Sequence, residues 1–267
     1  MEIIGELINT SRQRIAAAVE AKDIPYLQGL AREQVNAGAK YIDVNCGTFM
    51  EKEPETLAWL VQVVQEAVDV PLSLDSPNPV ALERALKVHR GRAIINSISL
   101  ETERFQAVLP LVQGYDCSVI GLCMDDGGMP ETAAQGVDYG SRLVEELGTA
   151  GISPERIYLD PLVRSIGTGP HYGPMFLETV AGLKQRYPQV HITCGLSNIS
   201  FGLPQRRLLN RVFLAMAMAA GLDSAILDPL DDELMAQLYA GSALLGRDEF
   251  CGEYIAAYRE GKLGGNP

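Results

Sequence analysis

Carboxylate and amide side chains recur in this sequence immediately after short apolar runs that have the composition of β-strands. The members of this polar set are Glu6, Asn9, Asp43, Asn45, Asp75, Asn96, Asp125, Asp160, Asn198 and Asp228. Burying so many polar groups is costly unless each is paired with another polar group, with the backbone or with water. A purely structural network would need all of them to be paired in this way, so the set favours a ligand-binding site.

The composition of this polar set limits the ligand that it can bind. Lys, Arg and His are almost absent from it, which argues against a phosphate or a simple carboxylate ligand, because either would need a cationic clamp. Ionised Asp only accepts hydrogen bonds, whereas Asn both donates and accepts them, so a ligand rich in N–H donors fits better. A flat heterocycle with a guanidine-like edge, such as a pterin, meets this description.

A divalent metal ion is the alternative ligand, since Asp and Asn are also hard oxygen ligands. No tight ligand spacing accompanies the carboxylates, and the three histidines, His89, His171 and His191, fall outside the polar set. We therefore expect these histidines to be surface or structural groups. We also expect no tightly bound metal.

The segment 195–207, GLSNISFGLPQRR, places a polar, glycine-rich turn directly after the apolar run 190–194. An apolar stretch of good helix formers follows at 208–220, so the expected local order is strand, exposed turn and helix. Asn198 would then lie just past a strand end, with an amide that can both donate and accept. The alternative is that Ser197 or Asn198 only caps the following helix.

Regularly alternating strands and helices would bring the polar set together. Strands are expected at residues 3–8, 41–46, 72–74, 93–98, 118–124, 157–159, 190–194 and 225–227, and helices at 24–37, 55–68, 79–88, 102–113, 136–149, 172–186, 208–220 and 232–245, with a further helical stretch at 12–21. Eight such units predict an α/β fold, a (β/α)8 TIM barrel, in a single domain over residues 1–267 with a frayed tail at 259–267. A doubly wound open sheet is the alternative.

Composition excludes several classes of function. The chain has 22 Lys and Arg against 34 Asp and Glu, a formal net charge of −12, so we expect no nucleic-acid partner. Its five cysteines form no CxxC pair and mostly lie in apolar runs, which predicts reduced, buried thiols. The amino-terminal apolar stretch is too short for a signal peptide, and no run is long enough to span a membrane. We expect a cytoplasmic protein.

Several longer motifs match a known family. They are IIGELIN at the start, YIDVNCG at 41–47, LSLDS at 72–76, AIINSIS at 93–99, YLDPL at 158–162, GLSNISFGLP at 195–204 and NRVFLAMAMAAGLDSAILDP at 210–229. With these motifs the chain resembles the pterin-binding methyltransferases, which include methyltetrahydrofolate:corrinoid (iron-sulfur) protein methyltransferases and the folate domain of cobalamin-dependent methionine synthase. The resemblance covers almost the whole chain.

The resemblance implies specific roles for the polar residues. It assigns Asp75, Asn96 and Asp160 to the nitrogen-bearing edges of the pterin, and it makes Asn198 the catalytic amide that faces N5. Our count of hydrogen-bond donors and acceptors in the polar set agrees with this assignment.

Further family roles fall on the turn after the seventh expected strand. Gly195 and Ser197 would shape this turn, and Arg206 would approach the p-aminobenzoyl-glutamate tail of folate. The alternative for Arg206 is a solvated charge at a helix start. A supporting network would consist of Glu6, Asp43, Asn45 and Asp228.

The activity implied by the resemblance is transfer of the N5-methyl group of methyltetrahydrofolate to the Co(I) corrinoid (cobalamin) of a separate partner protein. The displacement would be SN2-like, with hydrogen bonding or protonation at N5. The sequence shows no fused homocysteine or cobalamin module, so the resemblance implies a free-standing enzyme. Relatives form homodimers, so it also implies a dimer. Three alternatives stay open, namely a non-catalytic folate-binding barrel, an enzyme like dihydropteroate synthase and a metal-dependent lyase. The chain lacks the basic residues that the synthase would use for its pyrophosphate leaving group.

Overall fold

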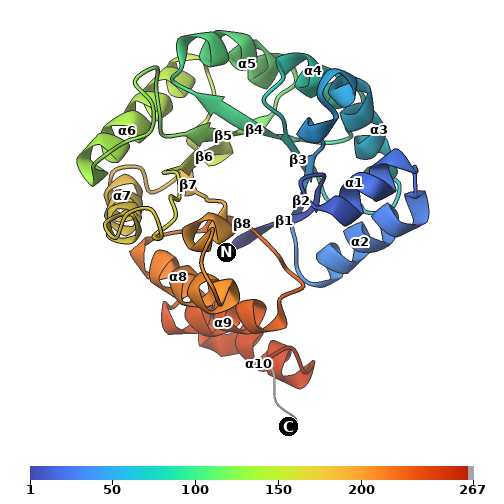
Figure 1. Cartoon of the computed structure of the whole chain (residues 1–267). Helices are drawn as coiled ribbons and strands as arrows, with labels where there is room; N and C mark the ends of the chain where they lie inside the picture. Colours follow the sequence, from blue (N-terminus) through green and yellow to red (C-terminus); the bar gives the residue numbers. More distant parts are fainter. Residues whose placement is uncertain (264–267) are drawn as a thin grey trace.

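Eight parallel strands form a barrel at the centre of the structure, a computed structural model that describes residues 1–263 (Figure 1). The strands are β1 (Glu2–Asn9), β2 (Tyr41–Asn45), β3 (Leu72–Asp75), β4 (Ile94–Ser99), β5 (Ser118–Leu122), β6 (Ile157–Asp160), β7 (His191–Ile192) and β8 (Ser224–Leu227). They pair in the order β7-β6-β5-β4-β3-β2-β1-β8. A parallel bridge between Gly195 and Ile226 links the two ends of this sheet. The nearly closed ring confirms the predicted TIM barrel, and the open doubly wound sheet is wrong.

Helices surround the barrel on the outside (Figure 1). They are α1 (Gln13–Glu20), α2 (Ile24–Asn36), α3 (Glu53–Gln65), α4 (Pro79–Val88), α5 (Thr102–Gly114), α6 (Ala133–Thr149), α7 (Tyr172–Arg186), α8 (Arg206–Ala220), α9 (Asp232–Leu244) and α10 (Gly252–Arg259). The Asp23 carboxylate accepts a hydrogen bond from the Tyr26 N–H at 3.2 Å, with Pro25 in the first turn of α2. The Asp23 side chain satisfies the free N–H of Tyr26, and Pro25 fits here because an N–H in the first turn would have no partner in the helix. These two residues therefore start a new helix after α1.

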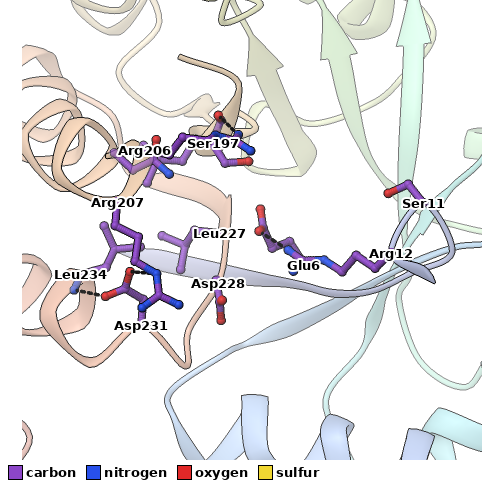
Figure 2. A pocket seen from close by; sticks show the side chains of 12 residues that line it. Glu6, Ser11, Arg12, Ser197, Arg206, Arg207, Leu227, Asp228, Asp231 and Leu234 are labelled. Atoms are coloured by element: carbon purple, nitrogen blue, oxygen red, sulfur yellow. Dashed lines mark hydrogen bonds and ion pairs between the residues drawn. The ribbon is translucent and has the colours of Figure 1, made fainter. Parts of the chain in front are cut away.

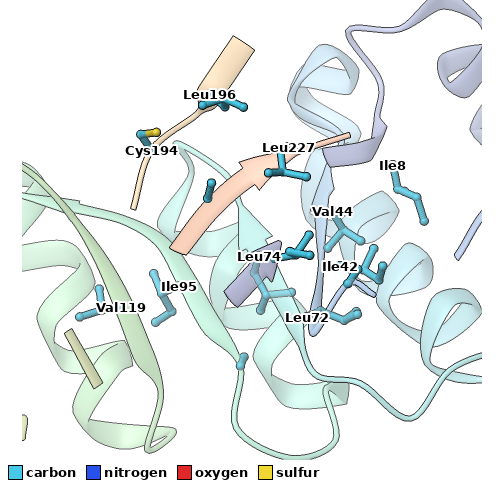
Figure 3. Close-up of a cluster of buried hydrophobic side chains, with 14 of the residues drawn as sticks. Ile8, Ile42, Val44, Leu72, Leu74, Ile95, Val119, Cys194, Leu196 and Leu227 are labelled. Carbon is cyan, nitrogen blue, oxygen red and sulfur yellow. The ribbon is translucent and has the colours of Figure 1, made fainter. Parts of the chain in front are cut away.

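The hydrophobic core lies between the strands and the surrounding helices. Figure 3 shows part of it, with side chains such as Val44, Leu74 and Ile95 that are fully buried. Strands covered in this way are almost continuously apolar, which explains why their positions can be predicted from the sequence.

A separate small cluster fills the inside of the barrel, formed by Ile4, Ile94, Ile120 and Tyr158. The Tyr158 hydroxyl donates to the Glu2 carboxylate at 2.7 Å, near the amino-terminal end of the barrel. This packing fills the barrel interior, as is typical of the fold, so a ligand site is expected at the carboxyl ends of the strands.

One of the five cysteines lies at the surface, in contrast to the expectation of buried thiols. Cys46, Cys117, Cys123 and Cys194 are buried as expected, but Cys251 is exposed, because it follows the last barrel helix in the turn that leads to α10. Arg259 ends α10, and the rest of the expected frayed tail includes residues 264–267, which lie outside the described residues. In the described part of the chain, no helix has the length and apolar character needed to cross a membrane.

Candidate active site

The carboxyl ends of the strands surround a cavity of about 330 Å³. Its lining consists of Glu6, Asn9, Ser11, Arg12, Asp43, Asp75, Asp160, Gly195, Ser197, Asn198 and Ile226. Residues from both ends of the chain therefore share one site, as the barrel topology requires. Most of the polar set predicted from the sequence lies here.

Two amides hold the carboxylates of β2 and β3. The Asn45 side chain donates to the Asp75 carboxylate at 2.8 Å. The Asp43 carboxylate accepts hydrogen bonds from the Ser73 hydroxyl at 2.7 Å and from the Asn96 amide at 3.2 Å. These contacts link three adjacent strands, so the positions of Asp75 and Asn96 depend on each other.

Burial controls the charge of this carboxyl pair. It raises the pKa of Asp43 well above its usual range, and the neighbouring Asp75 charge raises it further. It also raises the pKa of Asp75 to about 6, although the Asn45 amide and the Arg104 guanidinium oppose this shift. Ionisation of both carboxyl groups at the same time is therefore unfavourable.

Asp160 closes the opposite side of the cavity at the end of β6. Burial raises its pKa to about 7, and the N–H groups of Leu162 and Gly195 partly offset that rise. The Leu162 N–H donates to the Asp160 carboxylate at 2.8 Å. Asp160 is thus a buried acceptor whose charge can change near neutral pH.

The turn after β7 places Asn198 at the mouth of the cavity. Residues Leu196–Ser200 form a short 3-10 helix, in which the Asn198 N–H donates to the Gly195 carbonyl at 3.2 Å. The helix α8 begins only at Arg206, and Gln205 precedes it without a side-chain cap. The alternative role of Ser197 or Asn198 as the cap of this helix is therefore wrong. The exposed Asn198 amide is accessible to a ligand.

A second cavity of about 490 Å³ adjoins the first (Figure 2). Glu6, Ser11, Arg12 and Ser197 line both cavities, whereas Arg206 and Asp228 line only the second. The Arg206 guanidinium donates to the Ser197 carbonyl at 2.7 Å and to the Ser200 hydroxyl at 3.1 Å. It therefore braces the turn that carries Asn198, while Arg206 is also exposed at the start of α8, as the alternative of a solvated charge at a helix start predicts.

A third cavity of about 270 Å³ lies on the other side of Asp75 and contains Asn96 and Arg104 in its lining. The sequence did not indicate Arg104 and Arg12 as site residues, because neither stands at a strand end or in the 195–207 turn. Arg12 forms an ion pair with Glu6 at 2.6 Å. The expectation that the mouth is almost free of cations is therefore wrong, because loops and helix starts bring arginines to it.

Some members of the polar set lie outside these cavities. Asp125 lines none of these three cavities, because β5 ends at Leu122 and the chain then turns through a bridge between Asp125 and Gly128. Its carboxylate pairs with Arg142 at 3.0 Å. None of the three histidines lines these cavities either. In the described part of the chain, no three His, Cys, Asp or Glu side chains group in a way that could hold a metal ion.

Gly195 approaches Asn198 closely. A Cβ atom at position 195 would lie 3.0 Å from the Asn198 side-chain nitrogen, although the backbone angles, φ −74° and ψ 91°, suit any residue. We expect the Gly195→Ala variant to fold normally but to displace the Asn198 amide. The single-turnover rate of methyl transfer should fall roughly tenfold, since a small displacement of a catalytic group lowers the rate strongly. The control is Gly29→Ala in α2, where an added Cβ meets no atom within 4 Å. A Gly195→Ala rate equal to the control rate would contradict this placement of the amide.

A TIM barrel whose mouth gathers buried carboxylates and amides belongs to the class of barrel proteins suited to bind a flat, N–H-rich heterocycle. The comparison with known families agrees with this class. Residues 5–228 match the family described as pterin binding enzyme, and the chain belongs to this family.

Individual relatives give a more specific comparison than the family as a whole. The chain is 39% identical over 266 residues to the methylcorrinoid:tetrahydrofolate methyltransferase of Eubacterium limosum, covering 99% of this chain and 98% of that protein. It is 32% identical over 238 residues to the methionine synthase of Mycobacterium tuberculosis, covering 84% of this chain but only 20% of that much longer protein. A dihydropteroate synthase structure from Xanthomonas albilineans, with 4-aminobenzoic acid, superposes with a TM-score of 0.70 at 17% identity over 93% of this chain and 92% of that one. This last similarity shows the fold alone.

Proposed function

We propose that this chain is a methyltransferase that moves a methyl group between N5 of methyltetrahydrofolate and the Co(I) corrinoid of a separate protein. The observation that carries the proposal is the 39% identity, over nearly the full length of both chains, with a methylcorrinoid:tetrahydrofolate methyltransferase. The matched methionine synthases extend the same inference, since their names also imply methyl transfer. Both folate and corrinoid are substrates in this account.

Asp75, Asn96 and Asp160 would bind the pterin ring. Asp75 lies between the 330 Å³ and 270 Å³ cavities, and Asp160 faces it across the first of them. Two ionised carboxylates accept hydrogen bonds from ring N–H groups, and the Asn96 amide can pair with an edge that both donates and accepts. The donor set of the mouth therefore fits a pterin.

Asn198 would act at N5. When the N5–methyl bond breaks, its electron pair returns to N5, and the Co(I) corrinoid takes up the methyl group as the nucleophile. The Asn198 NH2 group can donate to the electron pair that develops on N5, and its carbonyl oxygen can accept from N5–H when N5 is protonated. An amide supplies no net proton at neutral pH, so the proton must reach N5 from water or from the pterin site.

The adjoining cavity would receive the p-aminobenzoyl-glutamate tail. Arg12, Arg206 and Arg207 line it together with Glu6, Asp228 and Asp231. Arg207 is the most available cation, because its side chain is 77% exposed and its nearest carboxylate, Asp231, is 3.8 Å away. A carboxylate of the tail can pair with such a guanidinium.

We propose that residues 1–267 act as one pterin-binding domain in a cytoplasmic homodimer. The support for a dimer, besides the resemblance, is an apolar stripe on the outer face of α8. Leu208, Val212 and Met216 are 60%, 50% and 50% exposed and lie at helical spacing. Contiguous exposed apolar surface of this kind is typical of protein–protein contacts.

Two substrate pairs distinguish the proposal from its main alternative. The first is methyltetrahydrofolate with photoreduced cob(I)alamin under anaerobic conditions, and the second is dihydropterin pyrophosphate with 4-aminobenzoate. We expect enzyme-dependent loss of the Co(I) absorbance with the first pair and no dihydropteroate from the second. The reverse result would favour a synthase. Folate binding without turnover of either pair would favour a binding barrel.

A further inference from the structure

Arg104 connects the two loops that carry the pterin residues of β3 and β4. Its guanidinium donates to the carbonyl of Pro77 at 2.6 Å, to that of Ser76 at 2.9 Å and to that of Ser97 at 2.9 Å. Ser76 directly follows Asp75, and Ser97 directly follows Asn96. One planar side chain therefore fixes the backbone beside both residues.

The position of Arg104 in its own helix is electrostatically unfavourable. It lies in the first turn of α5, which begins at Thr102. The amino-terminal end of a helix carries partial positive charge and favours acidic residues such as the neighbouring Glu103. Local helix stability therefore does not explain an arginine here, and its contacts across to the β3 and β4 loops do.

Arg104 is also the cation that acts on Asp75. The charged or titratable groups that interact with Asp75 are Asp43 on β2, Cys46 just after it, Glu53 on α3 and Arg104 on α5. Glu6, Arg12 and Asp160 line the same 330 Å³ cavity as Asp75. Burial raises the pKa of Asp75, the Asn45 hydrogen bond and the Arg104 charge lower it, and the Glu53 charge raises it. Without Arg104, the acidic surroundings would favour protonation of Asp75 at a higher pH.

We propose that Arg104 is a positioning residue of the folate site, which fixes the spacing of Asp75 and Asn96 and keeps Asp75 ionised as an acceptor. The inference rests on the proposed folate-binding function. It assigns to the folate site a residue, Arg104, whose guanidinium contacts the loops beside Asp75 and Asn96.

The test measures methyltetrahydrofolate affinity by calorimetry from about pH 5 to about pH 8.5 for the wild type, Arg104→Met and Arg104→Lys. For Arg104→Met we expect affinity to fall about tenfold near neutral pH, mainly because Asp75 and Asn96 are no longer held in place. We also expect the acid midpoint that belongs to Asp75, at about pH 6 in the wild type, to rise by about one pH unit. For Arg104→Lys we expect weaker binding with an unchanged midpoint, since the charge stays but the planar fork is lost.

The control is Arg142→Met, which removes the arginine of the next helix, paired with Asp125 outside the three cavities. It should bind folate like the wild type. Wild-type affinity in Arg104→Met, or weaker binding with an unshifted acid midpoint, would overturn the inference while leaving the proposed function intact. If Arg104→Met does not fold, full wild-type affinity in Arg104→Lys would overturn it. A wild type that binds no folate would instead contradict the proposed function.

Discussion

Replacing Asn198 with alanine is expected to slow methyl transfer by about 10²- to 10³-fold, the loss seen when one preorganised donor is removed from a developing charge. Asn198 is exposed in the 3-10 turn after β7, so its side chain contributes little to the core. The backbone of the turn is held by the Gly195 carbonyl and by Arg206 at the Ser197 carbonyl, and the substitution leaves both contacts in place. The substitution should therefore lower the rate of methyl transfer and leave the stability of the fold unchanged.

The single-turnover rate at saturating folate and cob(I)alamin measures this step directly. Asn36→Ala is the matched control, because it removes an amide at the carboxyl end of α2, on the opposite side of the barrel from the mouth. Folate affinity of Asn198→Ala should stay within a few-fold of the wild type, since a transition-state interaction changes rate more than binding. A rate loss smaller than about threefold would remove Asn198 from the mechanism.

Asp160→Asn should produce the largest loss of folate binding. A hydrogen bond to a charged group contributes about 1.5–3 kcal/mol, so affinity above pH 8 should fall by about 10- to 150-fold. The raised pKa of Asp160, about 7, means that the ionised acceptor is populated above this pH and is lost as the pH falls through it. Wild-type affinity should therefore decrease on acidification through about pH 7, and the variant should lack this transition while keeping the one that Asp75 causes at about pH 6.

The same substitution should stabilise the fold. Asp160 is 8% exposed, and its pKa of about 7 lies above the unfolded value, so ionisation destabilises the native state as the pH rises between these values. The difference of roughly three units amounts to at most about 4 kcal/mol, which Asn avoids while keeping an acceptor for the Leu162 N–H. Thermal unfolding at about pH 8 checks this expectation. A variant that binds folate normally, or that is less stable than the wild type, would indicate a structural role for Asp160.

The strands and most helices could be predicted because burial on both faces leaves a simple pattern. Strands β2 and β3 carry buried apolar residues such as Val44 and Leu74, and each ends in a polar residue, Asn45 or Asp75. The barrel then brings these ends together. The prediction of a common mouth needed no knowledge of side-chain positions, only the parallel order of the strands.

The arginines could not be predicted in the same way. Arg104 reaches the site from a helix, through contacts with residues 27 and 28 positions earlier in the chain. Arg12 lies just before α1 and turns back to Glu6. Such contacts depend on side-chain reach across loops, and the periodicity of the sequence carries no signal for them. The prediction that Asp125 lies in the site was wrong for a related reason, because β5 ends three residues before it.

The most direct test of the central claim follows the methyl group itself. Methyltetrahydrofolate with a ¹³C label in the N5-methyl group is mixed anaerobically with photoreduced cob(I)alamin and the protein, and the carbon signal is observed by nuclear magnetic resonance. The account predicts that the labelled signal moves from N5 to cobalt at a rate proportional to the wild-type protein and is slowed strongly by Asn198→Ala. A labelled methyl group that stays on folate although folate binds would contradict transfer to free cobalamin. No binding of folate would contradict the account as a whole.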